Sequence, residues 1–335
     1  MSGVQIRTVA RDEDGMRLDR WFKVHFPQLT HGALQKLLRT GQIRLDGARA
    51  KSADRVVSGQ SVRVPPIPAA VTEKRERDRV RMSAADEAML KGIVIHRDEL
   101  VLALNKPAGL AVQGGTKTER HLDGMLDALT FEAAERPRLV HRLDRDTSGV
   151  LVLGRTRDAA NRLAKVFKSR DAMKVYWAIV RGVPKPWRAT IDLPLKKTGH
   201  AGDQRVVPAD PDDEEGQHAV TDYAVLAHAG QRAAFVALSP RTGRTHQLRA
   251  HMAAIGHPLL GDFKYGGEEA QFVEEIAPVL HLHARALSLP HPAGGRLRLV
   301  AEVPKHMRDS LRYLGFDEPA GDPFEAFAEL MAARK

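Results

Sequence analysis

Hydrophobic residues near the start of the chain first recur every three or four positions and then alternate. A first helix would bury one face made of Leu18, Trp21, Phe22 and Phe26. A second helix, capped by Thr30 and ended by Gly41, would bury the stripe Leu34, Leu37 and Leu38. Residues 43–45 and 61–64 then alternate as short strands around the turn Asp46-Gly47. The pattern predicts a compact module of two helices and a small hairpin over residues 17–64.

From residue 92 onward, apolar runs of strand length outnumber helical patterns. Strands are predicted over residues 93–95, 100–104, 150–153, 174–182, 190–193, 220–226 and 234–238, and again within 284–303. Helices are predicted from Asp158 with Leu163, Val166 and Phe167 on one side, over 246–255 up to Gly256, and from Asp322-Pro323 with the stripe Phe324, Phe327 and Leu330. Because strands and helices do not alternate regularly, we expect an α+β domain whose central sheet is mixed and mostly antiparallel.

Breaks in this pattern divide the chain into four segments. Residues 65–68 read PPIP, and the charge-dense run 74–81 follows, which is typical of a linker. Ser83 and Asp86 have the spacing of a capping box that would start a short helix. We therefore expect a first domain over residues 1–66, a linker over 67–90, a main domain over 91–310 and a C-terminal helical extension over 311–335.

Composition and charge narrow the class of protein. The chain of 335 residues has no cysteine, which excludes disulfides and thiolate nucleophiles and is typical of the cytoplasm. We find no signal-peptide pattern and no run of about 20 apolar residues, so we expect a cytoplasmic protein without a membrane partner. The net charge is +10, and residues 1–66 hold 12 basic against 6 acidic residues. This surplus indicates nucleic acid as the leading partner, although a solvated basic face would also fit.

A charged loop, residues 141–149, stops abruptly at a glycine and is followed by the apolar run 150–153. Such a loop feeds a buried strand and is a rigid place to mount chemistry. Asp144 stands beside Arg142 and Arg145, and a neighbouring guanidinium keeps a carboxylate ionised, as a nucleophile or general base requires. Asp146 is expected to hold the loop. A solvated turn with balanced charge and a glycosidase-like pair of carboxylates are the alternatives.

A second polar cluster covers residues 241–252. If the chain is helical from residue 246, His246 and Arg249 lie one turn apart and present donors to one side, where they would hold a phosphate or Asp144. A zinc site is the alternative, drawn from His246, His251, His257, His281 and His283, but the ligand spacing is wrong and cysteines are missing. Tyr176 is either a core aromatic of its strand or a surface on which an unpaired base stacks. The segment 114–118 lacks the spacing of a phosphate loop, which argues against a nucleotide cofactor.

These motifs carry a family resemblance over residues 17–310. The first module resembles the S4-type (αL) RNA-binding domain. The runs HRLDRDTSG at 141–149, KVY at 174–176 and GRTHQLR at 243–249 resemble, in that order, three motifs of the RluA-type pseudouridine synthases, and NKPAG at 105–109 matches their early motif. The segment AVQGG at 111–115 is most similar to the RluC-like branch, which modifies large-subunit ribosomal RNA. Gln113 stands where that branch tends to have histidine, which bears on the choice of target.

The resemblance implies the pseudouridine synthase fold and an isomerase that flips a uridine out of the RNA, detaches uracil at N1 and rejoins it through C5, without metal, ATP or other cofactor. Asp144 would be the essential carboxylate, either attacking the sugar or abstracting its 2′ proton. Arg249 would pair with Asp144, and Tyr176 would stack on the uracil and assist proton movement at C5. Arg142 would enter the space that the base leaves. Further RNA contacts would come from Arg244, His141, Lys174 and Arg155, and in the first domain from Arg17, Arg20, Lys36, Arg39 and Arg44.

Two other classes stay open at this point. A catalytically silent RNA-binding or ribosome-assembly factor would explain the charge but needs neither Asp144 nor Arg249. A hydrolase that depends on a metal or on carboxylates would leave the basic module unexplained. The sequence does not say which uridines are modified, or whether free large-subunit RNA or a precursor is the substrate; we expect a monomer.

Overall fold

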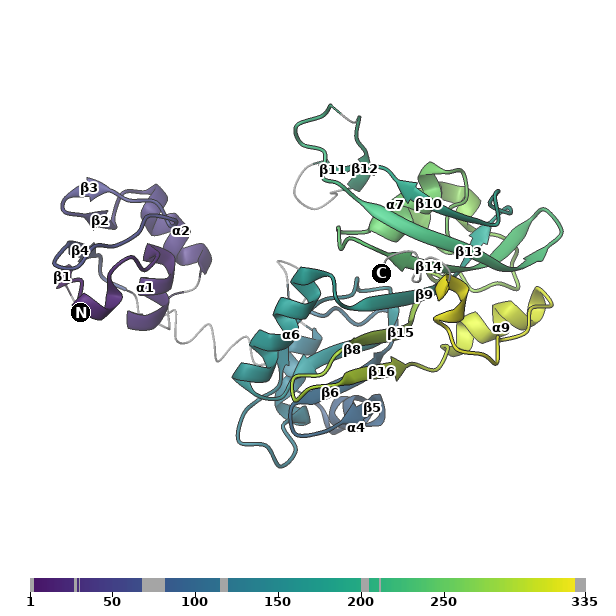
Figure 1. Cartoon of the computed structure of the whole chain (residues 1–335), viewed down its shortest axis with the longest axis horizontal. Coiled ribbons are helices and arrows are strands. Elements are labelled where there is room, and N and C mark those ends of the chain that lie inside the picture. The colour runs from purple at the N-terminus through teal and green to yellow at the C-terminus, as the bar shows by residue number, and fades with distance from the viewer. Residues whose placement is uncertain are drawn as a thin grey trace. The chain divides into compact units, whose positions relative to one another are not determined.

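The computed structural model describes residues 3–26, 29, 31–67, 82–114, 120–199, 205–210 and 212–328. The chain forms two compact units, Met1–Arg79 and Val80–Lys335 (Figure 1). This division falls inside the stretch expected to be the linker. None of the described helices is long and apolar enough to cross a bilayer.

The first unit packs two helices against a small sheet. The helices are α1 (Leu18–His25) and α2 (His31–Arg39), preceded by the 3-10 turn η1 (Arg11–Glu13). The strands are β1 (Gln5–Thr8), β2 (Arg44–Leu45), β3 (Ala48–Arg49) and β4 (Ser61–Val64), in the order β1-β4-β2-β3. The predicted apolar stripes of both helices form its core, as in the buried Trp21 and Leu34. The sequence analysis missed β1, and Thr30 lies outside the described residues.

The second unit is organised by a large mixed sheet, ordered β10-β13-β14-β9-β15-β8-β6-β5, with β16 beside β15 and β7 beside β8. Its strands are β5 (Val94–Arg97), β6 (Val101–Lys106), β7 (Arg138–Leu139), β8 (Ser148–Gly154), β9 (Met173–Arg181), β10 (Arg188–Asp192), β13 (Val220–Ala229), β14 (Ala233–Pro240), β15 (Leu282–Pro290) and β16 (Arg296–Val300). Among the described strands only β15 and β8 pair in parallel. The predicted mixed, mostly antiparallel sheet is confirmed.

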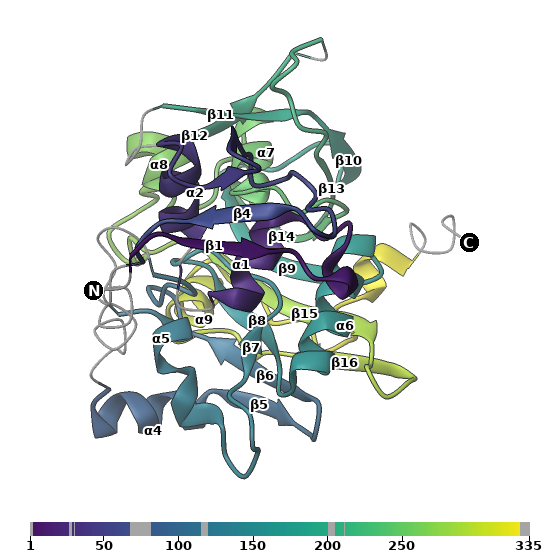
Figure 2. The same ribbon diagram turned by 90° about the vertical axis from the view of Figure 1, so that its left-hand side faces the viewer.

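Helices and turns cover both faces of this sheet. They are α4 (Ala84–Gly92), α5 (Leu122–Met125), η2 (Leu126–Leu129), α6 (Arg157–Ser169), α7 (Gln247–Ala254), α8 (Phe263–Gly266), η3 (Gly267–Ala270), α9 (Lys305–Tyr313) and η4 (Glu325–Phe327). A separate hairpin, β11 (Leu195–Thr198) with β12 (Arg205–Pro208), packs near α7. Figure 1 and Figure 2 both show α4 beside β5 and β6.

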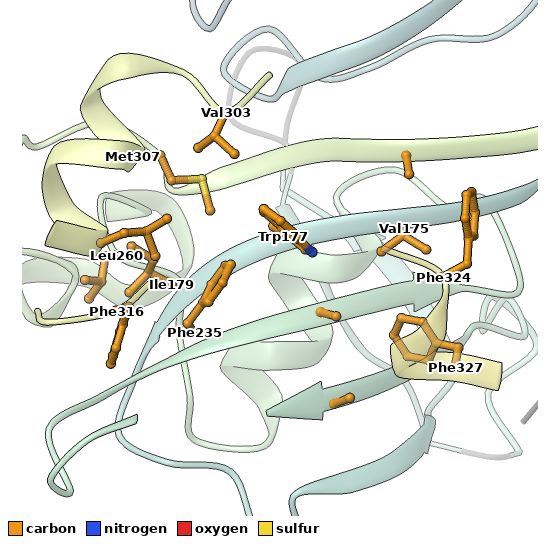
Figure 3. Packing of buried hydrophobic residues seen from close by; sticks show 14 of the residues in the cluster. Val175, Trp177, Ile179, Phe235, Leu260, Val303, Met307, Phe316, Phe324 and Phe327 are labelled. Carbon is orange, nitrogen blue, oxygen red and sulfur yellow. The ribbon is translucent and has the colours of Figure 1, made fainter. Parts of the chain in front are cut away.

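Strand β9 shows how the alternating pattern builds two cores. Its residues Trp177 and Ile179 face one side, where they pack with Phe235 of β14 and Met307 of α9 (Figure 3). Residues of the C-terminal turn join the same cluster. The intervening Ala178 and Val180 face the other side, where Leu248 and Met252 of α7 cover them. Because successive side chains of a strand point to opposite faces, one sequence run supports both layers. The strand therefore fixes α7, and the motif on it, against the sheet.

Several predicted boundaries need correction. Helix α6 is capped by Thr156, whose Oγ1 accepts a hydrogen bond from the amide of Ala159 at 3.1 Å, and Asp158 lies inside its first turn. Ser83 does cap α4, but the buried Leu90 packs into the main unit, so this helix is not linker. Helix α9, which was missed, spans the expected boundary at residue 310. Phe324 and Phe327 pack into the main core, and Leu330 lies outside the described residues.

Candidate active site

The loop that carries Asp144 enters β8 at a point where only glycine fits. Gly149 has φ +109°, and a Cβ there would lie 2.2 Å from the carbonyl oxygen of Ala284 on the parallel strand β15. Next to it, the Ser148 hydroxyl bonds to Nδ1 of His283 at 2.9 Å, and this imidazole reaches the Ala301 carbonyl through Nε2 at 3.3 Å. The run Thr-Ser-Gly therefore fixes the end of the loop against β15.

A buried lysine anchors the middle of the same loop. Lys106 ends β6 with no exposed surface, and its Nζ donates to the carbonyls of Pro107, Leu110 and Arg145, each at 2.9 Å. The amide of Gly109 also donates to the Arg145 carbonyl at 2.9 Å. Burial lowers the pKa of Lys106 to about 8, although the charges of Asp146 and Asp144 oppose this shift. Lys106 and Gly109 of the NKPAG motif therefore hold the backbone carbonyl of Arg145, the residue that follows Asp144.

The charged loop, β9 and the start of α7 together line one open pocket. Its walls include Asp144, Tyr176, Arg249, Arg142, Arg244, His141, Lys174, Thr147, Phe167 and His246. The structure therefore brings together seven of the eight residues expected to act in catalysis or to bind RNA in the main domain. Segments about 100 residues apart in the sequence meet here because β8, β15, β9 and β14 are neighbours in the sheet.

The eighth residue, Arg155, is placed elsewhere. It follows Gly154 at the opposite end of β8 from the loop, is only 8% exposed, and its Nη1 donates to the carbonyl of Asp98. It contributes to the packing of the β5–β6 turn and does not line the pocket. The structure argues against the phosphate contact that the resemblance implied, because this side chain is buried and lies outside the pocket.

Arg249 does not pair with Asp144 as predicted. Its guanidinium binds Asp262 in a two-pronged ion pair, with Nε to Oδ2 at 2.7 Å and Nη2 to Oδ1 at 2.6 Å, and both side chains are buried. Burial lowers the pKa of Arg249, but the hydrogen bonds and charge of Asp262 raise it more, so that the net pKa lies above the ordinary value. The negative charge of Asp144 also raises the pKa of Arg249, from a longer distance. Asp262 also caps α8 and so fixes the guanidinium.

The contact of Asp144 with a basic group comes from His246. His246 Nε2 lies 3.8 Å from Asp144 Oδ2. His246 precedes α7 in the left-handed region, with φ +51°, which turns its ring toward the loop. Burial lowers the pKa of His246, and the positive charge of Arg249 adds to this, against the opposing charge of Asp144. The neighbours of Asp144 in sequence do not pair with it: Arg145 binds Asp146 at 2.9 Å.

Part of the pocket lining is aromatic, formed by Tyr176, His141 and Phe167. Burial, and then the charge of Asp144, raise the pKa of Tyr176, so its phenol keeps its proton at neutral pH. His141 stacks on Phe167 with a centroid distance of 4.2 Å, and its Nε2 accepts the amide of Val152 at 2.9 Å. Burial, then the charge of Lys174, lower the pKa of His141 to about 3, so this ring is neutral. His141 acts here as wall and support more than as an RNA contact.

Besides Arg249, three cations border the pocket. Arg142 is exposed at its mouth. Arg244 is also exposed, and its Nε donates to the carbonyl of His218 at 3.1 Å, which holds it at the rim. Lys174 is deeper, 5.7 Å from the Phe167 ring, and burial lowers its pKa. A ligand that fits would be flat and apolar in its body and anionic at its edges.

Gln247 was missed by the sequence analysis and shapes the rim. Its Oε1 accepts from the Thr242 hydroxyl at 2.6 Å and from the amide of Arg244 at 3.1 Å. Its Nε2 donates to the Val220 carbonyl at 2.9 Å. All the polar groups of this buried amide are used, which fixes the turn at residues 242–244. Its place inside the GRTHQLR run was the only available signal.

The histidines considered as zinc ligands bind protein atoms. His251 bonds the Thr221 hydroxyl at 2.9 Å, and His281 bonds the Ser310 hydroxyl at 2.7 Å. His257 reaches the Arg181 carbonyl at 2.9 Å. In the part of the chain that the structure describes, no group of three or more His, Cys, Asp or Glu residues could hold a metal ion.

In the first unit, the five predicted RNA-binding cations are all exposed: Arg17, Arg20, Lys36, Arg39 and Arg44. Arg17 is partly neutralised by Asp19 at 2.6 Å. Arg44 is tied to its own hairpin through the carbonyl of Gly47 at 3.1 Å. Because they are exposed, these side chains can reach the phosphates of a polyanion without any rearrangement of the unit.

Comparison with known proteins agrees with the geometry of the pocket. The family model for RNA pseudouridylate synthase matches residues 100–254. A Salmonella typhi protein named ribosomal large subunit pseudouridine synthase C is 34% identical over 321 residues, covering 93% of this chain and 97% of the relative. An uncharacterized RNA pseudouridine synthase of Synechocystis is 32% identical over 316 residues, covering 91% of each.

Solved structures lead to the same result. Human RNA pseudouridylate synthase domain containing 4 has a TM-score of 0.59 and 31% identity, covering 70% of this chain and 97% of that one. Human RNA pseudouridylate synthase domain containing 1 has a TM-score of 0.53 and 27% identity, covering 68% and 96%. The chain belongs to the RluA-type family of RNA pseudouridine synthases.

Proposed function

We propose that this enzyme isomerises specific uridines of large-subunit ribosomal RNA to pseudouridine, with Asp144 as its essential carboxylate. The observation that carries the proposal is the position of Asp144 in one pocket with the aromatic ring of Tyr176 and the cations Arg142 and Arg244. The relative named ribosomal large subunit pseudouridine synthase C, aligned over 93% of this chain, supports ribosomal RNA as the substrate class.

The reaction rearranges one bond and has no net loss of atoms. The bond between N1 of uracil and C1′ of the ribose breaks, the base turns, and C5 bonds to C1′, while C5 loses a proton and N1 gains one. Asp144 acts at the sugar, by attack at C1′ or by removing the 2′ proton. The proposed chemistry calls on no metal or nucleotide cofactor, which a reaction in EDTA without added nucleotide tests.

Tyr176 and Arg249 have distinct tasks in this proposal. The protonated phenol of Tyr176 presents a flat, apolar ring on which a flipped uracil can stack, which repays part of the energy of unstacking. It would also assist proton movement at C5, although burial and then the charge of Asp144 raise the pKa of the phenol. Arg249, held by Asp262, lines the same pocket as Asp144 and would bind the substrate beside it without a direct pair to that carboxylate.

The first unit is proposed to be an S4-type RNA-binding domain. Its five exposed cations would contact phosphates and so add affinity without reading the target base. Arg142 and Arg244 at the mouth of the pocket would hold the RNA beside the flipped base, with Arg142 entering the vacated space. A monomer in the cytoplasm, acting on ribosomal RNA or its precursor, completes the proposal.

The test is a reaction of purified protein with unmodified large-subunit RNA in EDTA, followed by mapping of pseudouridine. The proposal predicts pseudouridine at one or a few discrete positions. The same protein carrying Asp144→Asn should bind the RNA with unchanged affinity and form none. Failure of the wild-type protein to form product, both on free RNA and on precursor particles, would refute the proposed function.

A further inference from the structure

A chain of polar contacts leads from the β11–β12 hairpin to Asp144. The amide of Val206 on β12 donates to the hydroxyl oxygen of Tyr265 at 3.0 Å. The same oxygen lies 3.0 Å from Nδ1 of His246, and Nε2 of His246 lies 3.8 Å from Asp144. The two rings meet edge to face, with centroids 5.7 Å apart and an interplanar angle of 87°. Three segments far apart in the sequence therefore converge on one carboxylate.

The donors in this chain all point toward Asp144. A backbone amide can only donate, so one lone pair of the Tyr265 oxygen is occupied by Val206. The phenol proton is then free to be donated to Nδ1 of His246. A neutral imidazole that accepts at Nδ1 carries its proton on Nε2, which is the atom that faces Asp144. Tyr265 thereby selects the tautomer that can donate to the carboxylate.

We infer that His246 is a positioning residue that orients Asp144 through its Nε2 proton, and that Tyr265 sets the tautomer and direction of that proton. The inference rests on the proposed function, because Asp144 must carry the reaction. At 3.8 Å the contact is longer than a hydrogen bond, and such contacts in active sites often shorten when substrate closes the pocket.

The charges around His246 favour a neutral donor over an ion pair. The charged and titratable groups that act on it are Asp144, Arg249, Lys264 and Asp262, with Tyr265 in direct contact. Arg249 is already bound by Asp262, so the fixed cation of the site is held away from Asp144. A neutral imidazole can orient the carboxylate without neutralising it, which leaves the oxygen available for attack or for taking a proton.

The backbone of His246 is a second observation in favour of this role. A left-handed conformation in a residue other than glycine costs free energy, and such residues concentrate at functional sites. Here the conformation at the N-cap of α7 aims the ring out of the helix and into the pocket, while no capping hydrogen bond is made by the side chain. The side chain at the N-cap position therefore contacts the active-site loop and does not stabilise the helix end.

Steady-state kinetics of three variants test the inference. Tyr265→Phe keeps the ring under Arg249, which lies 5.0 Å away, but removes the proton donated to His246. We expect its kcat to fall roughly tenfold with KM within twofold of wild type. His246→Gln keeps an N–H donor and should retain more activity than His246→Ala. Tyr223→Phe is the matched control, since this buried phenol donates to the Pro186 carbonyl at 2.8 Å, does not line the active-site pocket, and should leave kcat unchanged.

The pH profile separates this role from a structural one. In the wild type, kcat should fall on the acid side as His246 protonates, at a pH below the ordinary imidazole value because burial lowers its pKa. In His246→Gln this limb should move to lower pH.

The inference is overturned if Tyr265→Phe and His246→Ala keep wild-type kcat, or if His246→Gln leaves the acid limb in place. If Tyr265→Phe does not fold, as judged by circular dichroism, the two His246 variants decide. A wild-type protein that makes no pseudouridine overturns the proposed function itself.

Discussion

Replacement of Lys106 by methionine should loosen the active-site loop without touching the pocket. Methionine matches the length of the lysine stem but removes the ammonium that binds three carbonyls at 2.9 Å. The Arg145 carbonyl keeps the amide of Gly109 as a donor. The carbonyls of Pro107 and Leu110 lose the bond they make to Nζ. The loop therefore loses the bond from Nζ to the Arg145 carbonyl, and the carbonyls of Pro107 and Leu110 are left without the donor that Nζ provides.

The magnitude follows from those two carbonyls. Each buried group left without its hydrogen bond costs about 1–3 kcal/mol, so the loss is about 2–6 kcal/mol. Relief from burying a positive charge offsets part of this, and we expect a net destabilisation of about 3 kcal/mol. For a unit of this size, that corresponds to a fall in Tm of roughly 6–12 °C. Displacement of Asp144 by as little as an ångström would also lower kcat by about 10–100-fold.

Thermal unfolding and pseudouridine formation measure the two effects. Lys168→Met is the matched control, because Lys168 is exposed on α6 and should change stability by no more than about 0.5 kcal/mol. If Lys106→Met behaved like Lys168→Met in both assays, the anchoring role of Lys106 would be refuted.

Three further perturbations test separate parts of the account. Gly149→Ala should lower the free energy of unfolding in urea by about 3 kcal/mol or more, because its Cβ would overlap the Ala284 carbonyl. Gly294→Ala is the control, since Gly294 has a similar φ of +104° in open space. An equal loss of stability in the control would show that only backbone strain matters. Asp262→Asn should lower kcat by at least about tenfold in the pseudouridine-formation assay, since it releases Arg249 from its fixed position, and unchanged kcat would contradict a role for that pair in the active site. Replacing Arg20, Lys36 and Arg39 by glutamine should weaken RNA binding and reduce the slope of log affinity against log salt concentration by about 2–3 in a filter-binding titration. The single-turnover rate constant at saturating enzyme should be retained. An unchanged slope would place these cations away from the RNA.

Local patterns in the sequence were enough to predict the elements that carry the site. The apolar run after Gly149 is β8, the alternation around Tyr176 is β9, and the stretch ended by Gly256 is α7. Each of these depends on neighbouring residues, whose periodicity the sequence displays directly. The polar hairpin β11–β12 and the short edge strand β1 lack that periodicity and were missed.

Pairings between distant residues could not be predicted in the same way. Arg249 was expected to bind Asp144, but the chain folds back after Gly256 and brings Asp262 to the guanidinium. The carbonyls that bind Lys106 include that of Arg145, which is 39 residues away in sequence, so the tertiary fold alone creates this contact. Arg155 was misplaced because its burial depends on the packing of the β5–β6 turn around Asp98. The residue types of the site were predictable, and their partners were not.

The most direct test of the central claim is a comparison of ribosomal RNA from cells that lack this protein, complemented either with the wild-type chain or with Asp144→Asn. Pseudouridine is mapped across the large-subunit RNA in each case. The account predicts that discrete pseudouridines disappear in the deletion strain, return with the wild type and stay absent with Asp144→Asn at equal protein levels. Return of those pseudouridines with Asp144→Asn would contradict the assignment of Asp144, and an unchanged map in the deletion strain would contradict ribosomal RNA as the substrate.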